Sequence, residues 1–267
     1  MYFRATACDW GTSEFTDGKT TVTPTLEGHF CAGFPSFNFA IKDTSRYSIW
    51  MKDFDQLLAK GEVPQFNTIK FPNDHTSGQQ KDRISPTSAV ADNDLAVGLF
   101  VDHLSHSKIW NQSVVFILED DAQNGPDHVD AHRSPALVIS PYTKRNQVVS
   151  TMYSTSGFLR TMELILGLPP MSQYDAAATP LYDCFTSTPN FTPYLHKKAM
   201  VDLDIRNLAD NQSSKISESF SFAKEDDAPD LELNQVIWKS VKGEDAVMPA
   251  PRRSAFVISE KKKKDDD

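Results

Sequence analysis

The apolar positions of the chain follow two patterns, one with helical spacing and one of short continuous runs. Helical spacing predicts helices over residues 47–58, 86–105 and 155–166, and a shorter helix around residues 231–241. A glycine closely follows the first and the third of these segments, as is typical of the end of a helix. Helices are therefore expected at four places along the chain.

The short apolar runs predict β-strands between these helices. Residues 66–71 alternate loosely and stop at a proline, whereas residues 113–118 (SVVFIL) and 136–140 (ALVIS) are apolar runs rich in β-branched side chains. Such runs are typical of strands that are buried on both faces of a parallel sheet. Because they alternate with helices, they predict an α/β fold with a mainly parallel sheet flanked by helices. Residues 1–40 lack a clear period, so we expect them to be irregular, with short strands at most.

The segment EDDAQNGPDHVDAHR, residues 119–133, follows the first β-branched run directly. In α/β sheets, ligands bind outside the carboxyl ends of the strands, which is where Asp120 and Asp121 are expected. Adjacent carboxylates repel one another unless a cation neutralises them, and carboxylates combined with imidazoles suit zinc, manganese or a related divalent ion. His128 and His132 would supply the imidazoles. The alternative is a solvated acidic loop without a ligand.

Three other motifs do not fit this loop. A calcium-binding EF-hand that starts at Asp120 would have Ala122 and Ala131 at ligand positions. The two histidines have the spacing of a zinc protease helix, but Val129 stands where that motif needs a glutamate. Two adjacent acids are also unsuited to glycoside hydrolysis, which needs carboxylates on both sides of a sugar.

Composition narrows the class of ligand. The formal net charge of -9 argues against a nucleic-acid or anionic-membrane surface, and a phosphate substrate would need a bound cation. The chain has no apolar run long enough for a transmembrane helix, and its first residues lack the pattern of a signal peptide. The 3 cysteines lack metal-ligand spacing, and a Cys8–Cys31 bridge is one alternative to free thiols.

The central segment, VFILEDDAQNGPDHVDAHRSPALVISPYTKRNQVVSTMYS and the residues after it, closely resembles bacterial phosphoesterases of the phospholipase C/acid phosphatase type. These enzymes belong to the alkaline phosphatase superfamily. The likeness includes FPNDHTSG upstream and extends over about residues 36–256. It implies an alkaline phosphatase-like fold. Residues 1–35 would be an irregular start unlike the family, and residues 36–195 the C-terminal half of a phosphoesterase domain. Residues 196–256 would form an extension, and residues 257–267 a charged tail.

The resemblance also implies roles for individual residues. Asp120 and Asp121 match the acidic pair that binds metal, and His128 belongs to an Asp-His-Val element that closes the site, where His132 would replace or support it. His75 matches a histidine that contacts metal or phosphate, although an ordinary loop histidine is the alternative. Three residues are expected to contact substrate, with an ion pair as the alternative for the arginine: Asn73, Asp74 and Arg133. His103 and His106 are expected to be structural.

The function implied is metal-dependent hydrolysis of phosphate mono- or diesters, with zinc, manganese or calcium as the cofactor. Relatives place a Ser or Thr nucleophile in an N-terminal stretch that residues 1–35 do not resemble, and Thr12, Ser13 and Thr76 lack a recognisable nucleophile context. A truncated, inactive relative that keeps the fold is therefore the main alternative, and sulfate or phosphonate ester hydrolysis is a third. The family is often exported or periplasmic. The sequence indicates neither the nucleophile, nor a compartment, nor an oligomeric state.

Overall fold

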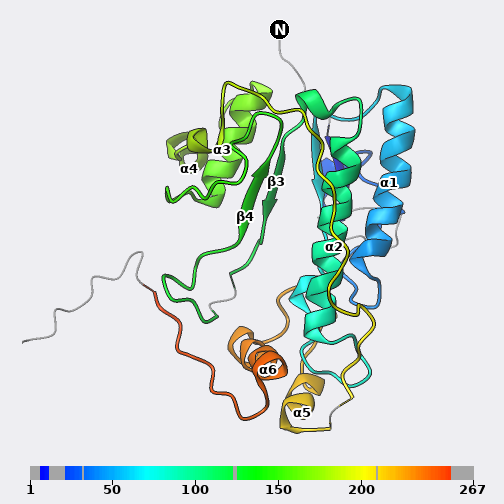
Figure 1. The fold of residues 1–267 in the computed structure, drawn as a ribbon, viewed down its shortest axis with the longest axis vertical. Helices are drawn as coiled ribbons and strands as arrows, with labels where there is room; N and C mark the ends of the chain where they lie inside the picture. The colour runs from blue at the N-terminus through cyan, green and yellow to red at the C-terminus, as the bar shows by residue number, and fades with distance from the viewer. Residues whose placement is uncertain (1–6, 12–21, 32, 123–124, 209, 254–267) are drawn as a thin grey trace, which may run out of the picture. The chain divides into compact units, whose positions relative to one another are not determined.

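The computed structural model describes residues 7–11, 22–31, 33–122, 125–208 and 210–253 (Figure 1). Thr12, Ser13 and the charged tail lie outside these residues. The chain divides into two compact units, each made of separate stretches of sequence. The first unit comprises Met1–His75, Val90–Ile117 and Leu137–Met200, and the second comprises Thr76–Ala89, Leu118–Ala136 and Val201–Asp267.

A parallel pair of strands joined by a helix begins the first unit. Strand β1 (Ala7–Trp10) pairs with β2 (Phe66–Ile69), and α1 (Asp43–Lys60) lies between them in sequence. Parallel strands need such a crossover, because a tight turn cannot join them. Helix α1 ends at Gly61, whose φ of 72° is left-handed, so the predicted stop signal is confirmed.

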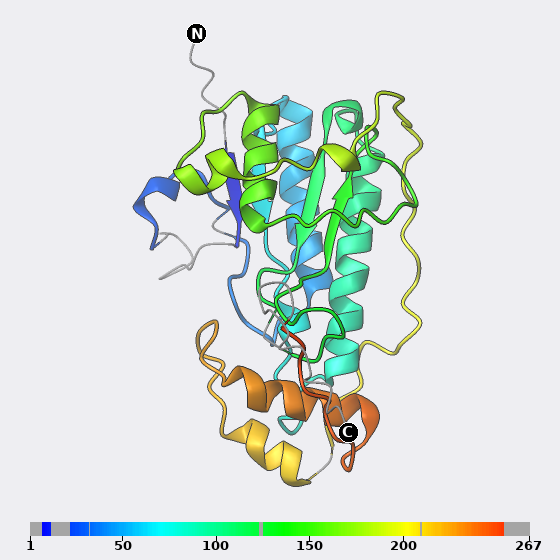
Figure 2. The same cartoon turned by 90° about the vertical axis from the view of Figure 1, so that its left-hand side faces the viewer.

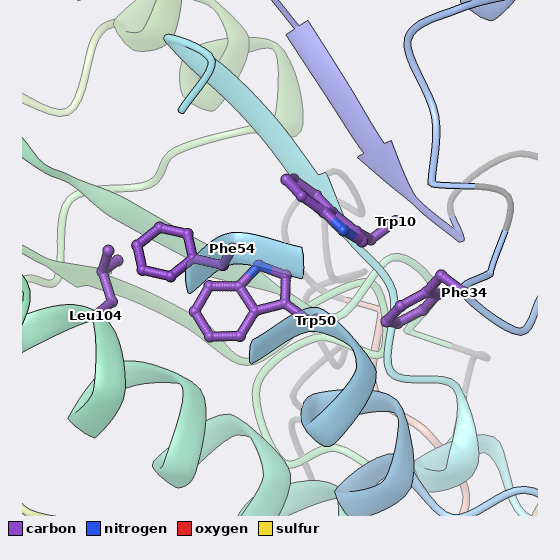
Figure 3. Packing of buried hydrophobic residues seen from close by; sticks show 5 residues of the cluster. All are labelled: Trp10, Phe34, Trp50, Phe54 and Leu104. Carbon is purple, nitrogen blue, oxygen red and sulfur yellow. The ribbon is translucent and has the colours of Figure 1, made fainter. Parts of the chain in front are cut away.

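Helix α2 (Pro86–Ser105) lies beside α1 in the same direction (Figures 1 and 2). Its bounds are those predicted from the sequence. The first unit has its core here, where the rings of Trp50 and Phe54 stack at 4.7 Å between centroids. The five buried side chains of this core come from β1, α1, α2 and the segment before α1 (Figure 3): Trp10, Phe34, Trp50, Phe54 and Leu104.

The two β-branched runs form a second pair of strands, but this pair differs from the prediction in its direction. In β3 (Val115–Leu118) and β4 (Ala136–Ile139), the backbone N–H after β3 bonds to the carbonyl before β4, Glu119 to Pro135 at 3.1 Å. The strands are therefore antiparallel, and the described residues form one parallel and one antiparallel pair instead of a mainly parallel sheet.

Burial of these strands also differs from the prediction. Strand β3 is half-buried along its length, and Leu137 of β4 is 55% exposed. The prediction that both runs are buried on both faces is therefore wrong. The apolar runs reflect the preference of β-branched side chains for extended backbone.

Two further helices complete the first unit. Helix α3 (Thr155–Leu166) has the predicted bounds and ends at Gly167, which has a φ of 68°. Helix α4 (Gln173–Ala177) was not predicted, because its five residues are too few to show a period. Short 3₁₀ turns lie at Pro24–Leu26, Asn73–His75, Trp110–Gln112 and Tyr182–Cys184.

The second unit contains α5 (Gln212–Glu218) and α6 (Asp230–Lys242), which lie side by side (Figure 2). The sequence predicted α6 but not α5, whose sequence QSSKISE lacks an apolar stripe. The buried apolar core of the second unit consists of four side chains: Phe220, Ala228, Leu233 and Val236. Segment 76–85 joins this core through backbone and side-chain bonds, including Gln79 Nε2 to the carbonyl of Val236 at 2.8 Å.

Two predictions about the chain as a whole can be compared with the structure. No helix among the described residues is both long enough and apolar enough to cross a bilayer. The thiols of Cys8, Cys31 and Cys184 are free, so the Cys8–Cys31 bridge is not formed. Burial raises the pKa of Cys8 to about 12, which disfavours its reactive thiolate form.

Candidate functional site

The first candidate segment is the turn Asn73–His75, which follows β2 in the first unit. Asn73 is buried, and both ends of its side-chain amide are bonded. The amide nitrogen donates to the carbonyl of Ile41 at 2.9 Å, and the amide oxygen accepts from Arg46 Nη1 at 3.3 Å. The structure therefore gives Asn73 a structural role, and its contact with substrate stays a prediction.

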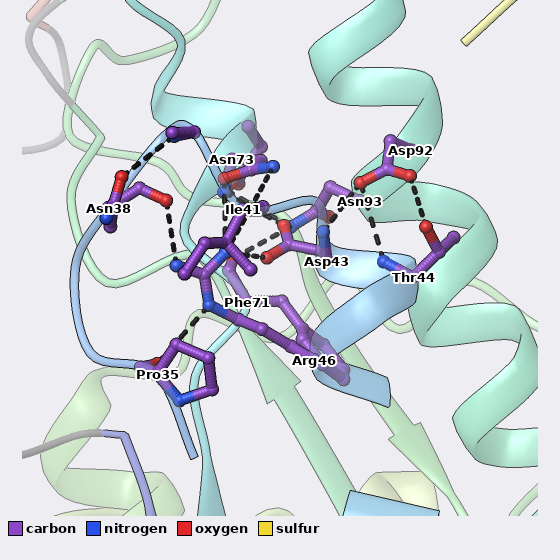
Figure 4. Close-up of polar contacts among 12 residues, drawn as sticks. Pro35, Asn38, Ile41, Asp43, Thr44, Arg46, Phe71, Asn73, Asp92 and Asn93 are labelled. Carbon is purple, nitrogen blue, oxygen red and sulfur yellow. Dashed lines mark hydrogen bonds and ion pairs between the residues drawn. The ribbon is translucent and has the colours of Figure 1, made fainter. Parts of the chain in front are cut away.

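Arg46 is the centre of the polar network beneath this turn (Figure 4). Its guanidinium is fully buried and pairs with Asp43 at 3.0 Å. Burying an unpaired charge is costly, and the network compensates by satisfying the guanidinium with backbone carbonyls as well. These carbonyls belong to the segment that precedes α1: Pro35, Ser36, Asn38 and Ile41.

The carboxylates of this network act as acceptors for backbone N–H groups. Asp43 Oδ2 accepts from the N–H of Asn73 at 2.9 Å, and Asp92 Oδ2 accepts from the N–H of Asp43 at 2.6 Å (Figure 4). Burial raises the pKa of Asp43 to about 6, against the opposing effect of the N–H of Asn73 and the charge of Arg46. The same burial lowers the pKa of Arg46. The turn is thus tied to the start of α1 and, through Asp43, to Asp92 of α2.

The other two residues of the turn are also held within the first unit. Asp74 Oδ1 accepts from Asn93 Nδ2 at 3.2 Å. The His75 ring stacks on Phe39 at 5.3 Å and meets Phe37 edge-on at 5.9 Å. These aromatic contacts hold the imidazole in place, so His75 is fixed by packing as well as by its backbone.

The remaining histidines singled out from the sequence lie at the end of α2. His103 Nε2 lies 2.8 Å from Asp55 Oδ1, and His106 Nδ1 lies 2.8 Å from the carbonyl oxygen of Asp102. Hydrogen bonds of this kind within the first unit agree with the structural role expected for both.

The acidic loop belongs to the second unit and begins at the end of β3. Asp120 and Asp121 are both exposed, so solvent reaches the two carboxylates. The bond between Glu119 and Pro135 closes the base of the loop. The acidic pair therefore follows a strand, as predicted, and both residues are exposed.

Asp127 is the acceptor that shapes the middle of the loop. Its carboxylate accepts the backbone N–H groups of Val129 and Asp130 and is paired with Arg133, whose Nη2 lies 2.9 Å from Oδ2. The N–H of Val129 and the guanidinium of Arg133 lower the pKa of Asp127 to about 2. Of the two readings for Arg133, the structure displays the ion pair, and the contact with substrate stays a prediction.

The two histidines of the loop differ in their surroundings. His128 is exposed, whereas His132 Nδ1 lies 2.7 Å from Oδ1 of Asp130. The Asp130 side chain is only 4% exposed, and that of His132 is 56% exposed. Sequence reasoning missed Asp130 as an individual residue. The available signal was a carboxylate two residues before a candidate histidine ligand.

The C-terminal segment holds the loop from another side. The N–H of Ala131 donates to the carbonyl of Arg252 at 2.6 Å, and the N–H of Arg252 donates to the carbonyl of Asp127 at 3.2 Å. Asp130 and Arg253 form an antiparallel bridge at the same place. The loop backbone around His128 is therefore paired with a strand-like segment from far along the chain.

The donors in this loop suit a divalent cation by their chemistry, since carboxylate oxygens and imidazole nitrogens bind zinc or manganese well. Four predicted ligands lie on one loop of the second unit: Asp120, Asp121, His128 and His132. His75 belongs to the first unit. Among the described residues, no group of three or more His, Cys, Asp or Glu side chains is arranged so that it could hold a metal ion.

Helices with small sheets are consistent with an α/β protein, and its acidic and histidine-bearing loop follows a strand. The sequence model of the Phosphoesterase family matches residues 26–169, which is more than half of the chain. The chain therefore belongs to the Phosphoesterase family. A comparison with curated proteins found no match. The matched range contains both candidate segments, whereas α5, α6 and Arg252 lie beyond it.

Proposed function

We propose that this protein is a metal-dependent phosphoesterase that hydrolyses phosphate mono- or diesters, similar to the phospholipase C/acid phosphatase type. Family membership supports hydrolysis of a phosphoric ester bond. The observation that carries the metal dependence is the exposed Asp120–Asp121 pair at the end of β3, with two histidines on the same loop.

Asp120, Asp121 and a histidine of the same loop would hold the ion. A bound divalent ion polarises the phosphoryl oxygens and stabilises the leaving oxygen. The protein has a net charge of -9, so it would repel an anionic ester without a cation at this position. The exposure of both carboxylates allows the ion and the ester to approach from solvent.

The nucleophile is not assigned to a side chain. Thr76, next to His75 in sequence, is buried at 2% exposure, and its Oγ1 accepts the backbone N–H of Gly78 at 3.0 Å. A hydroxyl that is used in this way within its own turn is poorly placed to attack phosphorus. A solvent-derived nucleophile or a Ser or Thr outside this turn fits the exposed loop better.

Turnover of aryl phosphate mono- and diesters, with zinc, manganese or calcium added to the chelator-treated protein, tests this proposal. Asp120→Asn and Asp121→Asn remove charge but keep side-chain shape, and each should lower turnover by roughly 100-fold or more, beyond the usual effect of outer-shell changes. Asp245→Asn, an exposed acid elsewhere in the second unit, is the matched control and should retain turnover. Equal activity in all three variants, or metal binding without turnover in the wild type, would contradict the proposal.

A further inference from the structure

Arg133 ends the acidic loop and is held by the turn that precedes it. Its backbone N–H donates to the carbonyl of Asp130 at 3.1 Å, and its side chain pairs with Asp127. Asp127 is itself fixed, because its carboxylate accepts the backbone N–H groups of Val129 and Asp130 and its carbonyl accepts from the N–H of Arg252. The guanidinium of Arg133 is therefore anchored to a carboxylate that the backbone of the loop holds in place.

The pair with Asp127 uses one edge of the guanidinium. Nε of Arg133 lies 3.2 Å from Oδ2 of Asp127, and Nη2 lies 3.1 Å from Oδ1 and 2.9 Å from Oδ2. A guanidinium is planar and presents N–H donors in a fixed fork, so a side-on pair of this kind leaves the edge formed by Nη1 and the second N–H of Nη2. In the part of the chain that the structure describes, no acceptor is bonded to Nη1, and the Arg133 side chain is 52% exposed. This second edge therefore faces solvent.

A guanidinium edge with two parallel N–H donors is suited to a phosphoryl group. The two donors match two oxygens of one phosphate, whereas the ammonium group of a lysine offers a point charge. Arg133 is also the only lysine or arginine in residues 119–133, where the other charged side chains are acids. A phosphate ester that approaches this loop would therefore find its one permanently charged cation at the edge formed by Nη1 and Nη2.

Asp127 contributes orientation to this arrangement. The N–H of Val129 and the guanidinium of Arg133 lower the pKa of Asp127 to about 2, so its carboxylate is ionised at neutral pH and the pair persists there. A guanidinium that is already held loses less conformational freedom when it binds a ligand. The carboxylate also offsets part of the positive charge, so the pair favours a defined geometry over long-range attraction.

We propose that Arg133 binds the phosphoryl group of the substrate through its Nη1–Nη2 edge, and that Asp127 is a positioning residue that holds the guanidinium from its Nε edge. The ion pair and the contact with substrate, which the sequence left as alternatives for Arg133, then exist together. This inference rests on the proposed phosphoesterase function, because that function identifies the ligand as a phosphate ester. It concerns the contact with the ester and assigns no metal ligand.

The first test measures the binding of inorganic phosphate to the full-length protein in the presence of a chelator. Side-chain resonances of ¹⁵N-labelled arginine, assigned by comparison with Arg133→Gln, report on each nitrogen of the guanidinium. Phosphate should shift the Nη resonances of Arg133, while the Nε–H that donates to Asp127 stays bonded. Sodium chloride at equal ionic strength should not cause this shift. No shift at Arg133, an equal shift with chloride, or loss of the bond from Nε–H would overturn the proposal.

The second test compares variants by phosphate affinity and by the KM for an aryl phosphate. Arg133→Gln should weaken both by about 10-fold, and Arg133→Lys by less, because it keeps the charge but lacks the fork. Asp127→Asn should weaken phosphate binding a few-fold, and it should add little to the loss in Arg133→Gln, because it acts through the guanidinium. Arg83→Gln, which changes an exposed arginine of the second unit outside the loop, is the matched control and should bind phosphate like the wild type.

The outcomes separate this inference from the proposed function. If Arg133→Gln binds phosphate and hydrolyses the ester as well as the wild type does, the role of Arg133 is wrong and the phosphoesterase function stands. If Asp127→Asn binds phosphate as tightly as the wild type, or more tightly, the positioning role is wrong. If phosphate binding depends on Arg133 but no ester is hydrolysed, the proposed function fails and Arg133 remains a phosphate contact. The two Arg133 variants keep the bonds of Asp127 to the backbone, so they test the contact even if Asp127→Asn disturbs the loop.

Discussion

Replacement of Arg46 by methionine is the change expected to disturb the first unit most. Methionine keeps the apolar stem of the side chain but removes the guanidinium, which donates to four backbone carbonyls and to Asp43 and Asn73. The fully buried Asp43 carboxylate would then lose its counter-charge. The segment before α1 would also lose the donors that hold its carbonyls.

The size of the expected stability loss follows from the burial of the Arg46–Asp43 ion pair. Removing one member of a buried, hydrogen-bonded ion pair costs about 3–5 kcal/mol, because the remaining charge stays buried and unpaired. Complete unfolding of a typical domain costs only about 5–15 kcal/mol. Arg46→Met should therefore remove a large part of the free energy of unfolding, and it should also loosen the turn that carries His75, since Asn73 bonds directly to Arg46.

Urea denaturation followed by circular dichroism measures this loss. Lys52→Met removes an exposed cation from the same helix and should change the free energy of unfolding by less than about 0.5 kcal/mol. The double variant Arg46→Met/Asp43→Asn should be less destabilised than the sum of its single changes, because the orphaned charge is also removed. The reasoning is refuted if Arg46→Met loses less than about 1 kcal/mol, or if the two changes simply add.

Three further predictions concern the loop, a helix end and pH. Arg252→Pro removes the N–H that donates to the carbonyl of Asp127 at 3.2 Å. It should speed hydrogen exchange in the acidic loop about fivefold, which corresponds to the loss of one hydrogen bond. The control Ala250→Pro should leave this exchange rate unchanged. Gly167→Ala places a Cβ on a residue with a φ of 68° and should lower the free energy of unfolding, measured by urea denaturation, by about 1 kcal/mol. Backbone strain alone would cause this loss, because the new Cβ would meet no described heavy atom within 4 Å. Burial raises the pKa of Asp43 from 3.8 to about 6, so the folded state binds an extra proton between these values. The contribution of Asp43 to the free energy of unfolding should therefore fall as pH rises from 3.8 through 6. When the free energy of unfolding is measured by urea denaturation over this pH range, Asp43→Asn should reduce its dependence on pH. An unchanged pH dependence in this variant would contradict the prediction.

The elements could be predicted from the sequence where local signals are strong. Apolar spacing and a terminal glycine placed α1 and α3 well, because a helix needs only nearby residues to show its period. The positions of β3 and β4 were also predicted, but their pairing and burial were not. Those properties depend on which strands meet, and an apolar run does not specify its partner.

In the candidate site, too, the segment could be predicted from the sequence, whereas its contacts could not. The composition of the acidic loop was enough to identify it, and the match to the Phosphoesterase family includes it. The bonds of Asn73 to Arg46, of Ala131 to Arg252, and of His132 to Asp130 were not predicted. The first two join residues far apart in the chain, and the third depends on the turn that Asp127 shapes. A single sequence does not reveal such contacts.

Metal content and turnover measured on the same protein sample test the central claim most directly. Wild-type protein, stripped with a chelator and reloaded, should retain about one or two divalent ions per chain and hydrolyse an aryl phosphate. The Asp120→Asn/Asp121→Asn double variant should lose both properties, and Asp245→Asn should keep both. A double variant that binds and hydrolyses like the wild type would contradict the assignment of the acidic loop as the metal site of this phosphoesterase.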